Sequence, residues 1–239
     1  MKACIAQWIG CREKQEDSYR VKYYPDGLLV VVADGMGGHH CGELASAVAV
    51  REFEVAFAAA AEKSVRERLL TALSVANTAV GAELGGCGGT TLVATFICKG
   101  VIWWVSVGDS PLLLWRNNRL QRLNADHSLR AVLLEYVAAG TMTHTEAIQR
   151  GHQLRSALTG EAPALVDSPL IPCPLLPGDR ILVASDGVDE LLLMPVLPDS
   201  VSRILNTPGG NPAVNLVEAC RQLADPAADN VTVVCVDCV

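Results

Sequence analysis

The sequence predicts an α+β fold in which helices pack on antiparallel strands. Short turns join successive apolar segments in the middle third of the chain, for example Lys99-Gly100 between residues 90–98 and 101–107. Strands joined by so short a turn are antiparallel neighbours, because a parallel pair needs a long crossover. Two long segments before this region instead carry apolar residues at helical spacing.

The chain has 239 residues, no internal repeat and no long linker, so we expect a single domain over 1–239. Hydrophobic residues make up 50% and charged residues 19%, which is typical of a globular protein. The net charge of -7 argues against nucleic acid as a partner and suits a site that collects cations. We find no signal peptide and no membrane-spanning segment, and we expect a cytoplasmic monomer.

The nine cysteines follow no disulfide framework, so we expect free thiols in a reducing compartment. Cys235 and Cys238 have the spacing of half a zinc site. They lie in an expected strand, however, where residues three apart point to opposite faces. Cys11 and Cys41 are also interpreted as ordinary thiols.

The first half of the chain predicts three strands followed by two helices. The expected elements are strands over 2–9, 18–24 and 28–33, and helices over 43–60 and 65–83. The strands follow from apolar alternation or from a continuous apolar run, with Pro25-Asp26-Gly27 as a turn. The second helix should bury an apolar face made of Leu69, Leu73, Ala76 and Val80.

The second half begins with a strand meander and ends with a strand that follows two helices. The expected elements are strands over 90–98, 101–107, 112–115, up to Leu123, 180–184 and 231–236, and helices over 126–139, 196–205 and 212–224. Asn211 and Pro212 supply the cap and the first residue of the last helix. Two prolines leave 170–176 at best an edge strand. Thr143 and Glu146 form a capping-box pattern, so Glu146 is interpreted as a cap and not as a catalyst.

An aspartate ends the most apolar strand. The run from Leu28 to Ala33 has no helical period, as expected for a strand buried on both faces, and Asp34 and Gly35 follow it. A bare charge is costly there, so Asp34 requires a cation or several donors. Gly35 allows the backbone to turn and its carbonyl to approach the same cation. The alternative is a simple Asp-Gly hairpin turn.

Three further aspartates lie close to strand ends. Asp186 follows a strand and precedes a glycine, Asp229 precedes the last strand, and Asp17 lies between two strands. If these strands are neighbours, four carboxylates converge, and two divalent cations would offset their repulsion. Oxygen ligands favour Mg²⁺ or Mn²⁺. Two such ions can turn a bridging water into hydroxide, which suits attack on phosphorus.

Several short motifs, in order, resemble those of the metal-dependent protein phosphatases of the 2C type. They are Arg12 with Glu16-Asp17, ADGMGGH at 33–39, GGTT at 88–91, VGDS at 107–110, ADHS at 125–128, SALTG at 156–160, ASDG at 184–187 and DN at 229–230. Met36 resembles the bacterial branch. The resemblance implies two antiparallel sheets face to face, with helices on both outer faces.

The resemblance also implies roles for the site residues. Asp34 would bridge two metal ions and the Gly35 carbonyl would hold one, while Asp186 and Asp229 complete the second and Asp17 lies beside the pair, largely through water. Arg12 would grip the substrate phosphate, a role that suits the guanidinium fork. Asp126 resembles an aspartate that, with Asp186, holds a weaker third ion, in a mobile flap over about 126–160. The expected catalytic residues are Arg12, Asp34 and Asp186, with Glu16, Asp109 and Asn230 as supports behind the ligands.

Some positions leave alternatives open or depart from the family pattern. Arg12 could instead pair with Glu16 on the surface, Asp109 could simply form a turn, and His127 could be a proton donor or a structural histidine. Met36 stands where eukaryotic members carry a histidine proposed to protonate the leaving oxygen. Gln15 and Pro111 replace the usual Asn and Arg of the family, and neither change removes a metal ligand.

The function expected from these residues is metal-dependent hydrolysis of phosphoserine and phosphothreonine in proteins, without a phosphoenzyme. Phosphorylated proteins and a cognate Ser/Thr kinase would be the partners. No cysteine is followed six residues later by arginine, and no Gly-Lys-Ser/Thr follows the glycines at 85–89, so cysteine phosphatases and P-loop enzymes are unsupported. The alternative is a catalytically silent phosphoprotein-binding module on the same fold. Such a module would be expected to lack one of Asp34, Asp186 or Asp229, and all three are present.

Overall fold

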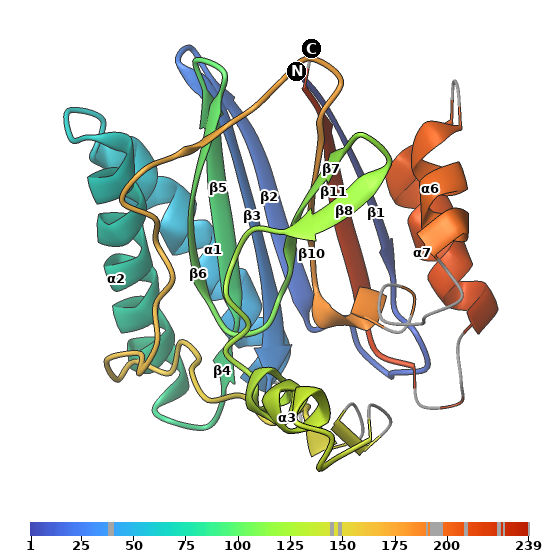
Figure 1. Cartoon of the computed structure of the whole chain (residues 1–239). Helices are drawn as coiled ribbons and strands as arrows, with labels where there is room; N and C mark the ends of the chain where they lie inside the picture. The colour runs from blue at the N-terminus through green and yellow to red at the C-terminus, as the bar shows by residue number, and fades with distance from the viewer. Residues whose placement is uncertain are drawn as a thin grey trace.

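Two antiparallel β-sheets lie face to face, and helices cover both outer faces (Figure 1). The computed structural model describes residues 1–37, 41–143, 146–147, 150–189, 191, 198–207, 210–223, 226 and 228–238. One sheet has the strand order β1-β11-β10-β7-β8, and the other β2-β3-β5-β6-β9 with β4 paired to β3. The expected four-layer α+β sandwich is confirmed.

The strands of each sheet come from distant parts of the chain. The first sheet contains β1 (Lys2–Trp8), β11 (Val231–Asp237), β10 (Arg180–Ala184), β7 (Leu112–Arg116) and β8 (Arg119–Arg122). The second contains β2 (Asp17–Tyr24), β3 (Gly27–Met36), β4 (Gly89–Thr90), β5 (Leu92–Cys98), β6 (Val101–Val107) and β9 (Cys173–Pro174). The first strand therefore pairs with the last one, whereas β2 and β3 form a local hairpin.

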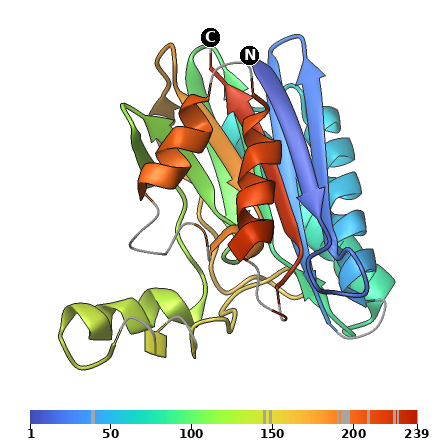
Figure 2. The same ribbon diagram turned by 90° about the vertical axis from the view of Figure 1, so that its right-hand side faces the viewer.

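The helices form the outer layers. The long helices α1 (Cys41–Ala59) and α2 (Val65–Leu84) cover the second sheet, and α6 (Pro198–Asn206) and α7 (Pro212–Leu223) cover the first (Figures 1 and 2). Another helix, α3 (Leu129–Ala138), extends from the lower end of the sandwich (Figure 2). In the described part of the chain, no helix is both long and apolar enough to cross a membrane.

Strand β3 is buried on both faces, as its continuous apolar run predicts. Leu29 and Val31 pack in the cluster under α1 and α2, whereas Val30 and Val32 pack between the two sheets. Successive side chains of a strand point to opposite faces. Asp34 continues the even-numbered series, so β3 directs its carboxylate toward the space between the sheets.

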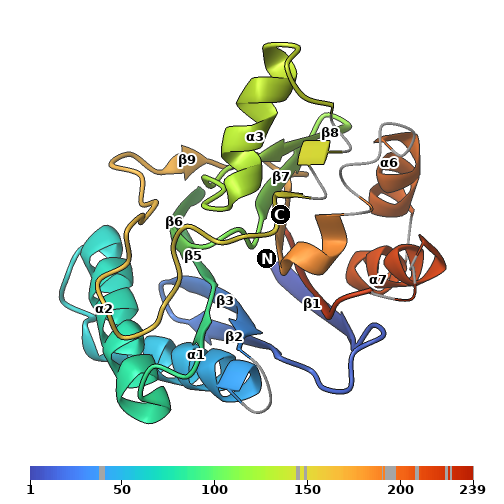
Figure 3. The same cartoon turned by 90° about the horizontal axis from the view of Figure 1, so that it is seen from below.

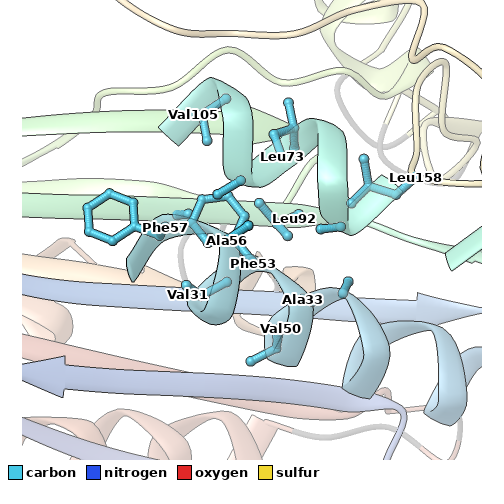
Figure 4. Close-up of a cluster of buried hydrophobic side chains, with 14 of the residues drawn as sticks. Val31, Ala33, Val50, Phe53, Ala56, Phe57, Leu73, Leu92, Val105 and Leu158 are labelled. Carbon is cyan, nitrogen blue, oxygen red and sulfur yellow. The ribbon is translucent and has the colours of Figure 1, made fainter. Parts of the chain in front are cut away.

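The outer cluster of the second sheet anchors both long helices. Phe53 and Phe57 of α1 are fully buried in it, beside residues of β3, α2 and β5 (Figure 4). Burying a side chain of this size contributes about 1.5–3 kcal/mol. The predicted apolar face of α2 is buried in the same cluster, so that prediction is confirmed.

Most expected elements are present, with shifts at their ends. The predicted cap of α7 is confirmed, because Asn211 Oδ1 accepts the N–H of Ala213 at 3.1 Å. Only Cys173–Pro174 of the expected 170–176 edge forms a strand. The capping box is also confirmed, since the Thr143 N–H donates to Glu146 Oε2 at 2.9 Å and the Glu146 N–H to Thr143 Oγ1 at 3.3 Å.

The sequence predicts that this helix begins at Asp126, but α3 begins at Leu129. The cause is local, because Asp126 Oδ1 accepts hydrogen bonds from the backbone N–H of Ser128 at 2.8 Å and from its hydroxyl at 2.6 Å. A short acidic side chain that bonds the backbone two residues on favours a turn over a helix.

Cys41 and Cys87 form a disulfide, so the expectation of free thiols is wrong for these two residues. Strand pairing of Met36 with Gly89 brings the loop before β4 against the first turn of α1. The two cysteine Cα atoms lie 6.2 Å apart, although 46 residues separate them in sequence. The sequence could not indicate this pair, because it depends on the short β3–β4 contact.

Replacing both Cys41 and Cys87 with serine should lower the free energy of unfolding by about 2–4 kcal/mol, because the bond closes a long loop in the unfolded chain. Denaturant titration of the wild type and the double variant, each with and without reductant, measures this effect. Reductant should shift only the wild type. Equal transition midpoints for the oxidised and reduced wild type would contradict the prediction.

Candidate metal centre

A cavity of about 790 Å³ lies at the lower end of the sandwich, the end that faces the viewer in Figure 3. Its acidic lining residues are Glu16, Asp34, Asp109, Glu161, Asp186 and Asp229. Arg12, His152 and Arg155 also line it. The cavity therefore collects carboxylates from segments that are far apart in sequence.

Strand pairing explains why these carboxylates meet. Asp17 and Asp34 lie directly opposite each other on β2 and β3. Strands β10 and β11 are antiparallel neighbours, so Asp186, just after β10, and Asp229, just before β11, lie at the same end of the other sheet. Because the two sheets face each other, the pair Asp17 and Asp34 lies close to the pair Asp186 and Asp229 at one end of the sandwich. The predicted convergence of the four aspartates is thus observed.

The GGTT motif holds the backbone of Asp34 on both sides. The Asp34 N–H donates to Thr91 Oγ1 at 3.0 Å, and the Asp34 carbonyl accepts from the Thr91 N–H at 2.9 Å and from the Thr90 hydroxyl at 2.9 Å. Both threonines are buried. These bonds fix the position of the carboxylate without using its oxygens.

Asp34 and Asp186 are neighbouring buried acids whose ionised forms are disfavoured. Burial raises the pKa of Asp34 well above its usual range, and the nearby Asp186 and Asp17 raise it further. Burial and the charge of Asp229 likewise raise the pKa of Asp186. A divalent cation would remove the cause of both shifts, because it stabilises the ionised forms.

Asp17 lies behind this pair with one oxygen bound and the other free. Its Oδ2 accepts from the hydroxyls of Ser185 and Thr232, each at 2.7 Å. Its Oδ1 is buried and, among the described atoms, has no hydrogen-bond partner. Burial raises the pKa of Asp17 to about 7. A buried carboxylate oxygen without a donor is costly and indicates a ligand, either a cation or a water bound to one.

Arg12 borders the cavity beside Asp229. Its Nη2 lies 2.7 Å from Asp229 Oδ2, and its side chain is 51% exposed. The alternative pairing with Glu16 is not the contact that the structure shows. Since half of the guanidinium side chain is exposed, Arg12 can leave Asp229 for another anion at little cost.

Asn230 ties the loop that carries Arg12 to the last strand. Its Nδ2 donates to the carbonyls of Ile9 and Lys14 at 2.7 and 2.9 Å, and its Oδ1 accepts from the Glu16 N–H at 2.7 Å. Asn230 is buried and uses its amide on both sides of the loop. The expected supporting role of Asn230 thus has a structural basis.

Gly35 and Gly42 allow two segments to touch beside the cavity. A Cβ on Gly35 would lie 2.0 Å from the Gly42 carbonyl oxygen, and one on Gly42 would lie 2.6 Å from Glu16 Oε1. Burial raises the pKa of Glu16, while Arg12 lowers it. Glu16 is therefore held against the start of α1, beside the metal centre, as expected of a supporting residue.

The donor set suits a hard divalent ion. Among the described residues, no group of three or more His, Cys, Asp or Glu side chains is arranged to hold an ion as it stands. Arg12 occupies Asp229, and the neighbouring Asp186 disfavours the ionised form of Asp34. A cation could replace Arg12 at Asp229, and carboxylate oxygens are the ligands that Mg²⁺ and Mn²⁺ prefer.

Two further aspartates lie on the α3 side. Asp109 is buried and lines the cavity, and burial together with Asp186 raises its pKa to about 8. Asp126 is not among the described residues that line the cavity. Its Oδ2 lies 3.2 Å from Arg122 Nη1 and 3.6 Å from Arg130 Nε.

His127 has a structural role. Its Nδ1 accepts from the Gly108 N–H at 3.2 Å, and its backbone N–H donates to the Gly108 carbonyl at 3.1 Å. Burial lowers the pKa of His127. Of the two interpretations of His127, the structural histidine is confirmed. Gly38 and His39 of the ADGMGGH motif lie outside the described residues.

Sequence reasoning missed several residues that shape the site. They are the hydroxyls of Ser185 and Thr232, the ion pair of Arg130 with Asp189, and the wall residues His152 and Arg155. Ser185 stands inside the ASDG motif, so its position was a usable signal. His152 and Arg155 depend on how the segment after α3 folds back, and Thr232 and Asp189 depend on contacts between distant segments, which no local pattern indicates.

Solved structures that resemble the whole chain are protein phosphatases. The Ser-Thr phosphatase MsPP of Mycobacterium smegmatis, in complex with cacodylate, has a TM-score of 0.77 and 32% identity, over 100% of this chain and 99% of that one. The catalytic domain of PstP in complex with two manganese ions has a TM-score of 0.78 and 27% identity, over 99% and 97%. The fold is thus that of these protein phosphatases.

The chain belongs to the protein phosphatase 2C family, which matches residues 12–221. The serine/threonine phosphatase stp of Listeria welshimeri is 33% identical over 69% of this chain and 68% of its own length. The serine/threonine protein phosphatase PstP of Mycobacterium tuberculosis is 31% identical over 95% of this chain, which spans 43% of that longer protein. These relatives are bacterial, as Met36 suggested.

The metal-free protein should become less stable as the pH rises from about 4 to about 8. The pKa of Asp17 is raised from 3.8 to about 7 and that of Asp109 from 3.8 to about 8, so both favour the fold while protonated and lose this contribution as they ionise. Each pKa unit corresponds to about 1.4 kcal/mol. Saturating Mn²⁺ should remove most of this dependence.

Thermal unfolding between about pH 5 and pH 8 in EDTA, and again in Mn²⁺, measures the effect. The comparison of the two series separates the site carboxylates from the rest of the protein. An unfolding midpoint that rises with pH in EDTA would contradict the prediction, because it would show that Asp17 and Asp109 ionise without loss of stability.

Proposed function

We propose that this chain, a serine/threonine protein phosphatase of the 2C type, hydrolyses phosphoserine and phosphothreonine in proteins with two Mn²⁺ or Mg²⁺ ions. The observation that carries the proposal is that Asp34, Asp186 and Asp229 from both sheets line one cavity with Arg12, while the buried Asp17 lies opposite Asp34 on the neighbouring strand. The similarity to named serine/threonine phosphatases, and to a structure with two manganese ions, supports it.

In this proposal each aspartate has a different role in holding the ions. Asp34 would help to hold both ions, the Gly35 carbonyl would hold one, Asp186 and Asp229 would hold the other, and Asp17 would act largely through water. When bound, two such ions supply Lewis acidity that activates water for attack on phosphorus and offsets the charge of the phosphate. The buried hydroxyls of Ser185 and Thr232 keep Asp17 in place.

Arg12 changes partner when substrate binds. Its guanidinium leaves Asp229 and forms paired hydrogen bonds with phosphate oxygens, because the planar fork matches two oxygens of one phosphate. Asn230 holds the loop so that the exposed guanidinium remains at the border of the cavity. The phosphoryl group passes directly to water, with no phosphoenzyme. Met36 cannot donate a proton to the leaving oxygen.

For the substrate and the cellular context we propose a class of protein and not an individual protein. Residues 152–157 and 161–164 line the cavity and would contact the polypeptide around the phosphorylated residue. A Ser/Thr kinase that acts on the same proteins would be the cognate partner, and the mobile flap over 126–160 and the monomeric state stay predictions. The cytoplasmic location also stays a prediction, although the Cys41–Cys87 disulfide is unusual for a reducing compartment.

The silent binding module is the alternative function. It predicts that a phosphopeptide binds and is not turned over. Asp34, Asp186 and Asp229 are all present and border the cavity, which favours the enzyme. Turnover measured beside binding decides between the two.

Activity on a phosphothreonine peptide should require a divalent ion and should be lost in excess EDTA. Asp34→Asn and Asp186→Asn should each reduce kcat by about 100-fold or more, because each removes a charge that the paired ions need. Glu62→Gln, at an exposed acid far from the cavity in sequence, is the matched control and should retain full activity. Full activity of the wild type in EDTA would end the metal hypothesis.

Arg12→Lys should raise KM for the phosphopeptide by about tenfold and lower kcat less, since lysine keeps the charge and loses the fork. Arg12→Ala should lose more in both constants. Steady-state kinetics at saturating Mn²⁺ measures the split. Unchanged constants in both variants would remove Arg12 from substrate binding.

A further inference from the structure

Arg130 is a buried arginine whose charge faces three aspartates. Its side chain is 5% exposed. Its Nη2 lies 2.5 Å from Asp189 Oδ2 and 3.9 Å from Asp109 Oδ2, and its Nε lies 3.6 Å from Asp126 Oδ2. The contact with Asp189 is an ion pair without hydrogen-bond geometry, because Asp189 Oδ2 has no hydrogen-bond partner among the described atoms. A buried charge is costly unless it is paired, so the three carboxylates hold this guanidinium in the acidic region.

The three aspartates come from different parts of the fold. Asp109 follows β6 and lines the cavity. Asp189 directly follows the short 3₁₀ turn of Asp186–Val188, which begins with the proposed ligand Asp186. Asp126 precedes α3. Arg130 thus connects the first turn of α3 to the two segments of the sandwich that hold the cavity acids.

Arg130 also fixes the position of residues 151–155, a segment that forms a wall of the cavity. Its backbone N–H donates to the Gly151 carbonyl at 3.1 Å, and the neighbouring Leu129 N–H donates to the Gln153 carbonyl at 2.8 Å. A Cβ on Gly151 would lie 2.4 Å from the Cβ of Arg130. His152 and Gln153, which belong to this segment, line the cavity. A shift of Arg130 would therefore move the wall.

Asp126 is poorly placed to hold the third ion that the family resemblance implies. Its Oδ1 is used by Ser128, and its Oδ2 faces the guanidinium groups of Arg122 and Arg130. A divalent cation at Oδ2 would lie beside two positive charges in a region shielded from water, where repulsion is strong. The described contacts of Asp126 do not fit a metal ion.

We propose that the Arg130 guanidinium takes the place of a third metal ion, joining Asp109, Asp126 and Asp189 and holding the 151–155 wall against the metal centre. Arg130 is then a positioning residue, because it acts on substrate only through the wall. The inference rests on the proposed phosphatase function for its kinetic consequences, but not for its effect on ion binding or on the wall.

The first test counts ions. Calorimetric titration with Mn²⁺ should give two ions for the wild type, whereas Arg130→Met should bind an additional, weaker ion, since Asp109 and Asp189 then lack their cation and Asp126 keeps only Arg122. Arg119→Met, at an exposed arginine on β8, is the control and should match the wild type. A wild type that binds three ions, the third lost in Asp126→Asn, would overturn the inference.

The second test follows the wall and does not need metal. Hydrogen exchange of residues 151–155 in EDTA should accelerate by about tenfold in Asp189→Asn and in Arg130→Met, and less in Arg130→Lys, which keeps the charge. Asp189→Asn keeps the arginine in place and so serves if Arg130→Met fails to fold. Unchanged exchange in the folded variants would also overturn the inference.

The third test uses kinetics. With saturating Mn²⁺, Arg130→Lys should raise KM for a phosphopeptide by about tenfold and leave kcat on p-nitrophenyl phosphate near the wild-type value, because only the peptide contacts the wall. Equal effects on both substrates would contradict a positioning role. If the wild type bound no Mn²⁺, the proposed function would fail, while the exchange measurement would still decide the role of Arg130.

Discussion

Mutual repulsion between buried carboxylates is the constraint on which the structure of the site depends. Two sheets bring Asp34, Asp186 and Asp229 to one cavity with Asp17 close by, and burial raises the pKa of Asp17, Asp34 and Asp186. Without ions, the raised pKa values favour the neutral forms of these groups, and Arg12 pairs with Asp229. Bound cations would stabilise the ionised forms, although the described acids would have to rearrange to hold an ion together.

The surrounding polar groups hold these acids without neutralising them. Thr90 and Thr91 bind the backbone of Asp34, Ser185 and Thr232 bind one oxygen of Asp17, and Asn230 binds the loop of Arg12. The two arginines then differ in burial. Arg12 is half exposed and can exchange partners, whereas Arg130 is enclosed and cannot. The exposed Arg12 can therefore contact substrate, whereas the buried Arg130 stabilises the protein.

Much of this organisation could be predicted because it follows local rules. The apolar run before Asp34, the helix caps and the apolar face of α2 depend on residues near one another in sequence, and the order of the short motifs indicated the two-sheet fold. Three features could not be predicted from local patterns. The Cys41–Cys87 disulfide depends on the two-residue strand β4, the late start of α3 depends on the side chain of Asp126, and the pairing of Arg130 with Asp189 depends on how distant segments fold together. Asp126 illustrates the limit, since its motif matches the family while the structure pairs it with Arg122 and Arg130, which the motif does not indicate.

The pairing of β1 with β11 has a consequence for how the enzyme comes into being. On the ribosome, β2, β3, α1 and α2 can associate early, whereas residues 2–8 have no strand partner until residues 231–237 have been made. Contacts this distant in sequence form slowly, and unpaired strand edges invite aggregation. The loop that carries Arg12 likewise lacks its hydrogen-bond partner until Asn230 has been made. A nascent chain therefore cannot complete the first sheet or the support of the Arg12 loop until residues 230–237 have been made.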